Sequence, residues 1–336
     1  MQEEVAWFHE RVGALRAEIG RVIVGQRPVV DGVIACLVGD GHVLLEGVPG
    51  LGKTLLVRTL SSCLSMAFRR VQFTPDLMPA DIIGTQILTD DPGKGRQMVF
   101  REGPLFTQLL LADEINRATP KTQSALLEAM QERQVTVAGH RRPLPDPFFV
   151  MATQNPLEQE GTYPLPEAQL DRFFYKILVP FPSLDDLVAV VDRTTGNEKQ
   201  DANPVLNPDE LARMRRIVRD VPVAPEVTRY AMRLVLGTHP DSAFPTPTAK
   251  RFVRYGASPR GGQTLIVGGK VNALFAGRAR VSIADVRAAA APSLRHRIGR
   301  NFDAEAEGLT ADAIVERVLA EVPEAEGRVA KELAAS

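Results

Sequence analysis

The sequence predicts an α/β protein with a parallel, doubly wound sheet that is followed by a mostly helical region. Before Pro180, short apolar runs of strand composition alternate with helical patterns, and this alternation is typical of parallel sheets. After Pro182 the strand-like runs stop and helical periodicity takes over. With 336 residues, 44% of them hydrophobic, the chain is long enough for about two domains.

The first segment is predicted to be an amphipathic helix that ends near Gly25. Its apolar side chains recur at helical spacing, with charged residues between them: Val5, Phe8, Val12, Leu15, Ile19 and Val22. Strands are predicted at residues 43–46, 70–73, 109–113, 148–153 and 174–179. Helices are predicted to begin at Lys53 and Pro120, and we expect the hydroxyl of Thr119 to cap the second of them.

Two segments interrupt this alternation and are predicted to be β-hairpins. The first spans residues 82–101, and the second spans residues 134–144. Both contain residues that favour turns between two short strand-like runs. The predicted turns are Asp90, Asp91, Pro92 and Gly93 in the first hairpin and Ala138, Gly139 and His140 in the second.

The change in composition after Pro182 sets the predicted domain boundary. Residues 1–182 form the predicted core with both hairpins, and residues 183–336 form a second, helical domain. Helical patterns in the second domain cover residues 211–218 and 227–236. From Pro323 to the end the chain is polar and rich in alanine, so we expect this end to fray.

The charge balance and the cysteines restrict the classes of function. With 40 Lys and Arg against 41 Asp and Glu, the chain lacks the basic field that nucleic-acid-binding proteins use, so nucleic acid is an unlikely partner. Cys36 and Cys63 lie among apolar or small residues and are expected to be reduced core thiols. The first residues show no signal pattern, and no apolar run approaches the length of a membrane span. We therefore expect a cytoplasmic protein.

The strongest candidate site is the glycine-rich segment that follows the first predicted strand. It reads Gly47-Val48-Pro49-Gly50-Leu51-Gly52-Lys53-Thr54 and matches the phosphate-binding loop between a strand and a helix. Its glycines let backbone amides turn toward phosphate oxygens, while Lys53 supplies positive charge and the Thr54 hydroxyl can ligand Mg²⁺. We add the next residue, Leu55, to the predicted nucleotide contacts. A glycine-rich turn with a chance lysine is the alternative, which the flanking strand and helix disfavour.

Polar residues at the ends of two later strands would complete this site. The buried strand at residues 109–113 ends in Asp113 and Glu114; Asp113 would hold Mg²⁺, and Glu114 would polarise the attacking water. If the sheet is parallel, Asn155 lies beside them and could bind both the γ-phosphate and the water. Taken singly, the acids could be a solvated strand end, Asn155 a turn residue and Arg172 a surface cation.

In combination, these motifs resemble the MoxR family of AAA+ ATPases. The resemblance covers nearly the whole chain and rests on residues 47–54, 113–118, 153–156, 166–173 and 256–260. It implies a P-loop AAA+ core with a five-stranded parallel sheet flanked by helices, followed by a small all-helical lid domain. It also implies that ATP and Mg²⁺ bind between the subunits of a ring, commonly a homo-hexamer.

The resemblance also assigns roles to single residues. Residues 47–54 correspond to the Walker A motif, and Asp113 and Glu114 to the Walker B motif. Asn155 is then the sensor 1 residue, Arg172 the arginine finger offered to the neighbouring subunit's nucleotide, and Arg260 the sensor 2 arginine of the lid. The segment Val24, Gly25 and Gln26 matches the one that packs near the adenine.

The resemblance further implies a protein partner. Both hairpins resemble elements that face the ring pore. The client of such ATPases is often a protein with a von Willebrand factor A domain, which the ATPase helps to mature, activate or load with metal.

One departure from the family lies just after Arg260. Gly261, Gly262, Gly268 and Gly269 stand where relatives usually carry alanine. Each glycine costs about 1 kcal/mol relative to alanine inside a helix. The sequence therefore predicts a softened or shortened lid helix.

Several other classes of protein have to be weighed against this one. A GTPase is disfavoured because no Asn-Lys-x-Asp element follows a later strand. A nucleic-acid translocase could use the basic residues near the hairpin tips, Lys94, Arg96, Arg141 and Arg142, but no aromatic residues lie between them for stacking. The motor subunit of a metal chelatase shares the hairpin arrangement and stays an alternative. A scaffold that binds ATP without hydrolysing it is disfavoured by Glu114, Asn155 and Arg172.

Overall fold

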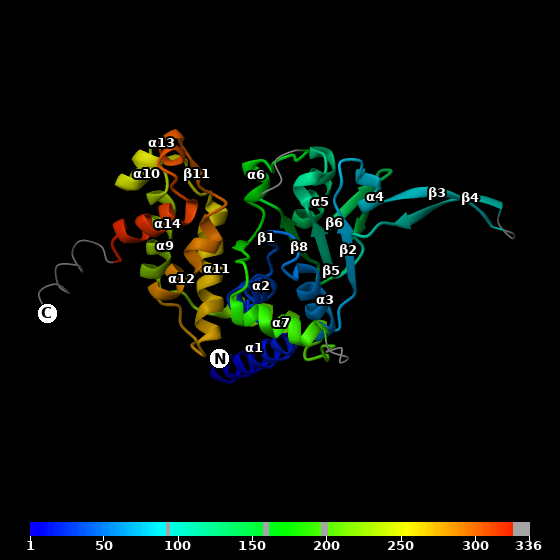
Figure 1. Ribbon diagram of the computed structural model, residues 1–336, viewed down its shortest axis with the longest axis horizontal. Helices are drawn as coiled ribbons and strands as arrows, with labels where there is room; N and C mark the ends of the chain where they lie inside the picture. The colour runs from blue at the N-terminus through cyan, green and yellow to red at the C-terminus, as the bar shows by residue number, and fades with distance from the viewer. Residues whose placement is uncertain (92–94, 157–160, 196–200, 325–336) are drawn as a thin grey trace, which may run out of the picture. The chain divides into compact units, whose positions relative to one another are not determined.

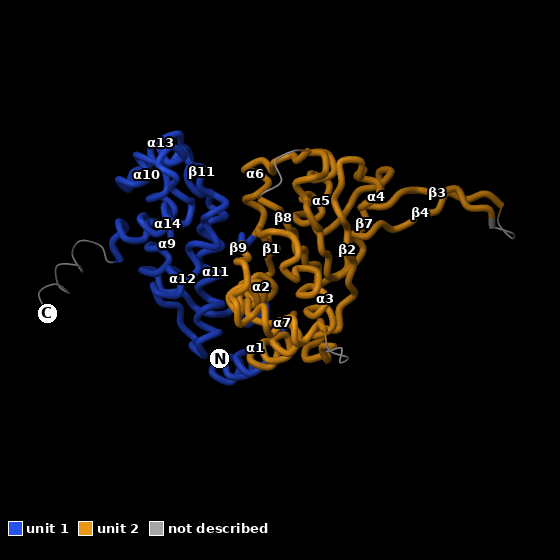
Figure 2. Tube along the Cα trace, in the orientation of Figure 1, with its two compact units in different colours: residues 1–12, 174–176, 213–336 blue, residues 13–173, 177–212 orange. Residues whose placement is uncertain are grey.

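The computed structural model describes residues 1–91, 95–156, 161–195 and 201–324. These residues form two compact units (Figure 2). Unit 1 contains residues 1–12, 174–176 and, from the last segment, residues 213–324, whereas unit 2 contains residues 13–173 and the described parts of 177–212. Each unit contains more than one segment of the chain, so the units do not test the predicted domain boundary after Pro182. That boundary stays a prediction.

Unit 2 contains four strands of a five-stranded sheet and the end of the fifth, which begins in unit 1 (Figure 1). The strands of this sheet are β1 (Val43–Glu46), β2 (Phe68–Gln72), β5 (Leu109–Asp113), β8 (Phe149–Gln154) and β9 (Tyr175–Leu178), in the order β2-β5-β8-β1-β9. The pairs β2–β5, β5–β8 and β8–β1 are parallel. Strands β5 and β8 are buried except at their last residue, as expected for a sheet covered on both faces. The predicted α/β fold is confirmed.

Helices flank this sheet and connect its strands. They are α1 (Gln2–Val22), α2 (Arg27–Val38), α3 (Lys53–Leu64), η1 (Ile115–Arg117), α5 (Pro120–Glu132), α6 (Glu167–Leu170) and α7 (Leu184–Thr195). Helix α5 begins at Pro120 as predicted, but the expected cap by the Thr119 side chain is wrong. The amide of Thr122, which the hydroxyl could have bonded, donates instead to the Thr119 carbonyl at 3.0 Å.

Both predicted hairpins are present in unit 2. The first consists of β3 (Gly84–Asp91) and β4 (Gly95–Glu102) after a short helix, α4 (Pro79–Ile83), and the second consists of β6 (Gln134–Val137) and β7 (His140–Pro143). Strand β3 continues through Asp90 and Asp91, where the turn was predicted; the other turn residues, Pro92 and Gly93, and the basic Lys94 lie outside the described residues. The β3–β4 hairpin projects away from the sheet (Figure 1).

The two hairpins are joined near the root of the longer one. The guanidinium carbon of Arg142, on β7, lies 3.9 Å from the centre of the Phe100 ring on β4. Phe100 also meets the ring of Phe106 edge-on, with 5.6 Å between ring centres. A cation over an aromatic face is attractive, so this contact ties the longer hairpin to the shorter one.

Unit 1 is mostly helical. Its elements include α9 (Pro225–Gly237), α10 (Pro247–Phe252), α11 (Pro259–Phe275), α12 (Ile283–Leu294), α13 (Phe302–Ala306) and α14 (Ala311–Glu321), preceded by α8 (Pro208–Asp220), which begins in unit 2. The expectation of an all-helical region is wrong in one detail, because β10 (Val253–Tyr255) and β11 (Gly299–Arg300) pair antiparallel. Strands this short are below the length at which alternation can be recognised in a sequence.

The glycines after Arg260 do not shorten their helix. Helix α11 runs for 17 residues, and all four glycines in it are buried. A Cβ atom on Gly268 would lie 2.2 Å from the Tyr175 hydroxyl, and one on Gly262 would lie 2.6 Å from the Met232 side chain. The predicted shortening is wrong because these glycines allow other parts of unit 1 to approach the helix closely, and that packing offsets their low helix propensity.

Both cysteines match the prediction of reduced core thiols. Cys36 and Cys63 are buried thiols that form no disulfide among the described residues, and burial raises the pKa of Cys63 to about 12. None of the helices in the described part of the chain has the length and hydrophobicity that a membrane span requires.

Candidate functional site

The glycine-rich loop lies between β1 and α3 in unit 2. Gly50 and Gly52 have φ angles of +83° and +74°, a region that side-chain-bearing residues seldom adopt. Lys53 is the first residue of α3. The loop therefore turns tightly enough to present the amino end of α3 to the carboxyl ends of the parallel strands.

The structure brings most of the predicted phosphate-site residues around one cavity of about 220 Å³. The cavity is lined by residues from the loop and from the ends of three strands: Pro49, Gly50, Leu51, Gly52, Lys53, Thr54, Arg70, Gln72, Asp113, Glu114, Thr153 and Asn155. The predicted acid pair and Asn155 thus share a cavity with Lys53 and Thr54. Their individual roles stay predictions.

Lys53 is half-buried at this cavity. Its ammonium donates to the Gly47 carbonyl at 2.6 Å. Burial lowers the pKa of Lys53, while the nearby carboxylates of Asp113, Glu114 and Glu46 act in the opposite direction. A cation placed against its own loop in this way is available to an anion that enters the cavity.

The two acids are oriented by neighbours from three segments. The Thr153 hydroxyl donates to Asp113 Oδ1 at 2.6 Å and accepts the Glu114 amide at 2.9 Å. Glu114 itself has a φ of +57°, and its Oε2 accepts from Gln72 at 2.7 Å and from Arg117 at 3.0 Å. Backbone in this region costs energy for a residue that bears a side chain and is common at functional sites.

Sequence reasoning missed Arg70, Gln72 and Arg117 as neighbours of the acids. Arg70 and Gln72 lie two residues apart on β2, and Gln72 pairs in register with Asp113. Residues two apart on a strand share one face, so both reach the acid pair. The alternation of polar residues near the end of this strand was the available signal, but its use required the pairing of β2 with β5.

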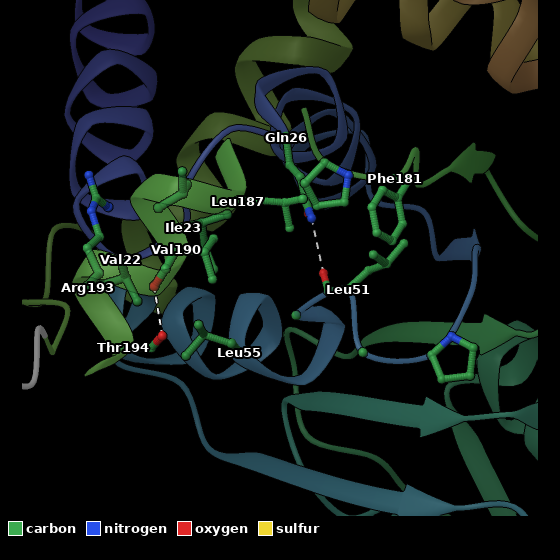
Figure 3. A pocket seen from close by; sticks show the side chains of 15 residues that line it. Val22, Ile23, Gln26, Leu51, Leu55, Phe181, Leu187, Val190, Arg193 and Thr194 are labelled. Atoms are coloured by element: carbon green, nitrogen blue, oxygen red, sulfur yellow. Dashed lines mark hydrogen bonds between the residues drawn. The ribbon is translucent and has the colours of Figure 1, made fainter. Parts of the chain in front are cut away.

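A second cavity of about 300 Å³ adjoins the same loop, sharing Pro49, Gly50, Leu51 and Gly52 with the first. Figure 3 shows Leu187 and Val190 of α7 on one side and Leu51 and Leu55 on the other. Most of the lining is apolar. A polyanion and an apolar ring could therefore occupy the two cavities together.

The predicted adenine-contacting segment borders this second cavity. Val24 and Gln26 line it, and Gln26 Nε2 donates to the Leu51 carbonyl at 3.1 Å (Figure 3). Gly25 is not among the lining residues. Its φ is +62°, and a Cβ atom there would lie 2.5 Å from the Asp186 carboxylate, so the close approach of α7 requires glycine.

Helix α7 supplies the wall that sequence reasoning missed. Its lining residues and those just before it are Phe181, Pro182, Leu187, Val190, Arg193 and Thr194. Apolar residues at helical spacing are ordinarily read as core. Only the fold reveals that this face of α7 borders a cavity.

The donor atoms fit the two groups that the sequence predicts. Thr54 and Asp113 offer hydroxyl and carboxylate oxygens to the same cavity, and Mg²⁺ prefers such oxygen ligands. The loop and Lys53 offer N–H donors and positive charge to phosphates. The apolar second cavity fits a flat base.

The two predicted arginines lie elsewhere. Arg172 follows α6, is not among the described residues that line either cavity, and donates to the Leu127 carbonyl of α5 at 2.8 Å. Arg260 is exposed at the start of α11 in unit 1, whereas both cavities belong to unit 2. The structure of a single subunit therefore does not test the predicted roles of Arg172 as arginine finger and Arg260 as sensor 2.

Two segments of the chain match known families. Residues 42–175 match the ATPase family associated with various cellular activities (AAA), and residues 248–318 match the AAA lid domain. A crystal structure of a Cytophaga hutchinsonii protein superposes with a TM-score of 0.88 at 38% identity, covering 96% of this chain and 97% of that one.

Similar proteins span most of the chain. Chaperone MoxR1 of Mycobacterium tuberculosis is 43% identical over 303 residues, which are 90% of this chain and 79% of the relative. The uncharacterized protein YeaC of Bacillus subtilis is 41% identical over 94% of this chain and 95% of its own length. Protein MoxR of Paracoccus denitrificans is 31% identical over 96% of this chain and 99% of its own length.

Proposed function

This chain belongs to the MoxR family of AAA ATPases, and we propose that it couples ATP hydrolysis to the remodelling of a protein partner. The observation that carries the proposal is the pair of cavities joined by the loop of Gly47 to Thr54. A polar cavity with a lysine and two acids beside an apolar cavity is what a nucleoside triphosphate requires.

Within this proposal, the polar cavity binds and orients the triphosphate. Lys53 and the loop amides bind the phosphates, and Thr54 and Asp113 hold Mg²⁺, which neutralises charge on the transferred phosphoryl group. Glu114 and Asn155 align the attacking water. Phosphoryl transfer depends mainly on such positioning and electrostatic stabilisation.

The proposed active unit is a homo-hexameric ring. Arg172 would reach the nucleotide of the neighbouring subunit, and Arg260 would contact a nucleotide from the lid. In support, the Arg172 guanidinium donates to a backbone carbonyl of α5, that of Leu127, and a negatively charged partner could replace this neutral acceptor. Hydrolysis would then move the lid domain relative to the core.

We propose that the client is a protein, and that it belongs to the proteins with a von Willebrand factor A domain. One relative is named a chaperone. The β3–β4 hairpin adds support, since Leu88 and Met98 lie opposite each other in register and are each 59% exposed. Exposed apolar side chains on a projecting element suit contact with another protein. A cytoplasmic location is part of the proposal, in keeping with the two buried thiols of Cys36 and Cys63.

A nucleic-acid translocase is less well supported by the same hairpins. Arg96 lies 3.7 Å from the Asp90 carboxylate, and Arg142 is stacked on Phe100. Two of the basic residues are thus already engaged. The motor subunit of a metal chelatase stays as the second candidate, since it would use the same nucleotide site on a different protein partner.

Affinity capture with a Glu114→Gln variant tests the proposal. This variant keeps the charge of Lys53 and the loop intact, so we expect it to bind ATP and hold its client while phosphate release falls by about 100-fold or more. A Glu128→Gln variant, altered on α5 outside the lining of both cavities, is the matched control. Normal phosphate release by Glu114→Gln would remove this residue from its role, and recovery of nucleic acid instead of protein would favour the translocase.

A further inference from the structure

The polar cavity contains a cation that neither the loop nor the predicted site accounts for. Arg70 reaches across from β2, and its Nε and Nη2 atoms both donate to Asp113 Oδ2, at 3.2 and 2.8 Å. The same Nη2 donates to the Gln72 side chain at 3.0 Å. Arg70 is therefore the direct counter-ion of the carboxylate to which the metal is assigned.

This contact and a bound metal ion would exclude each other. Asp113 Oδ1 already accepts the Thr153 hydroxyl at 2.6 Å, which leaves Oδ2 as the oxygen that Arg70 occupies. Mg²⁺ binds oxygen at about 2.0–2.1 Å in a strict octahedral arrangement. A guanidinium on the same oxygen would repel the ion and hinder that arrangement.

The two partners differ in their freedom to move. The Asp113 side chain is 15% exposed, whereas that of Arg70 is 47% exposed. Asp113 is fixed by Thr153 at the end of a buried strand, and Arg70 lies on β2, one of the two edge strands of the sheet. Arg70 is thus the partner that can leave.

We propose that Arg70 is a displaceable counter-ion that neutralises Asp113 in the metal-free site and competes with the divalent cation for that carboxylate. This inference rests on the proposed function, because it assumes that nucleotide and cation enter this cavity. Arg70 thereby acts as a positioning residue, which keeps Asp113 compensated until Mg²⁺ arrives together with ATP. When Arg70 is displaced, its hydrogen bond to the Gln72 side chain also breaks. Because the Gln72 amide donates to Glu114, binding of the cation then affects the surroundings of both acids.

The test measures how strongly Mg²⁺ strengthens nucleotide binding. A fluorescent, slowly hydrolysed ATP analogue is titrated into the full chain in excess Mg²⁺ and in EDTA. The dissociation constant in EDTA is then divided by the dissociation constant in Mg²⁺. Because coupling between ligands is reciprocal, this ratio reports the affinity of the site for the cation without any measurement of activity. Arg70→Gln should raise the ratio by about two- to fivefold, the range for a partly exposed ion pair. Arg70→Met should do the same, and Arg70→Lys, which keeps the charge, should stay near the wild type.

Arg69→Gln is the matched control. It removes the same charge one residue away, from a side chain that donates to the Gly103 carbonyl at 3.2 Å instead of to the acid pair. Its ratio should match the wild type. An equal rise in Arg69→Gln would overturn the inference, since the effect would then come from net charge alone.

The remaining outcomes separate the inference from the function on which it rests. If Arg70→Gln weakens binding of the analogue equally in Mg²⁺ and in EDTA, Arg70 contacts phosphate, and the proposed competition between Arg70 and Mg²⁺ for Asp113 is wrong. If the ratio does not change while the wild type binds the analogue, the inference fails and the proposed function stands. If the wild type binds no analogue in either condition, the proposed function fails and the inference with it.

Discussion

The two cavities beside the glycine-rich loop differ in how their walls are made. The polar cavity is lined by charged and hydrogen-bonded side chains from the loop, β2, β5 and β8, whereas the second is lined largely by apolar side chains from α3, α7 and the segment after α1. Most of the polar set could be named from the sequence, and most of the apolar set could not. Specific chemistry restricts residue type, while apolar contact accepts many residues.

The largest expected effect tests the polar cavity. Lys53→Met removes the positive charge at the phosphates, so we expect ATP hydrolysis to fall by about 100- to 1,000-fold. Thermal unfolding should change little, because the lysine side chain makes one hydrogen bond, to the Gly47 carbonyl. Phosphate release and melting curves provide the measurements. Undiminished hydrolysis in a well-folded variant would contradict the assignment of the polar cavity.

The next prediction tests the apolar cavity. Val190→Asp places a charge on the α7 wall of this cavity. Because a charge next to the buried base of ATP is unfavourable, we expect ATP affinity to fall about tenfold with little change in kcat. Val191→Asp is the control, because Val191 lies on the same helix, is exposed and does not line the cavity. Titration of a fluorescent ATP analogue distinguishes them. Equal losses in both variants would mean that α7 matters for folding and not for the base.

A third prediction extends the comparison to packing in unit 1. Helix propensity alone would make Gly268→Ala stabilising by about 1 kcal/mol. The new Cβ would, however, lie 2.2 Å from the Tyr175 hydroxyl and 2.9 Å from Ala289, so we expect destabilisation of about 1–3 kcal/mol from overpacking. Gly13→Ala in α1 meets no atom within 4 Å and should be neutral or stabilising. Denaturant unfolding checks the sign, and a stabilised Gly268→Ala would refute the close approach.

The smallest effect concerns a side chain with no role in either cavity. Burial raises the pKa of Cys63 from 9.0 to about 12, so the unfolded chain loses this proton at lower pH than the folded one. The contribution of Cys63 to stability is complete below pH 9 and is lost as the pH rises toward 12; at pH 10 the loss is about 1 kcal/mol. The free energy of unfolding is measured at pH 8 and at pH 10 for the wild type and for Cys63→Ala. It should fall less between the two pH values in the variant.

These contrasts explain what the sequence could predict. Lys53, Asp113 and Asn155 were found because each lies at or after the end of a recognisable strand, and parallel strands end at one edge of a sheet. Arg70 was missed because only the register of β2 against β5 places it at Asp113. Gly268 was misjudged because helix propensity is local, whereas its neighbour Tyr175 comes from a distant part of the chain.

The contact between Phe100 and Arg142 lies near the base of the β3–β4 hairpin, so movement at the far end of the hairpin is coupled to this contact. Phe100 lies two residues before Glu102, the base end of β4, and five residues after Gly95, its far end. At about 3.4 Å per residue, Phe100 lies about 7 Å from the Glu102 end of β4, and Gly95 lies about 24 Å from it. A rotation of the hairpin about its Glu102 end would therefore move Gly95 about three times as far as Phe100, and a load at Gly95 would press Phe100 against Arg142 with a correspondingly larger force.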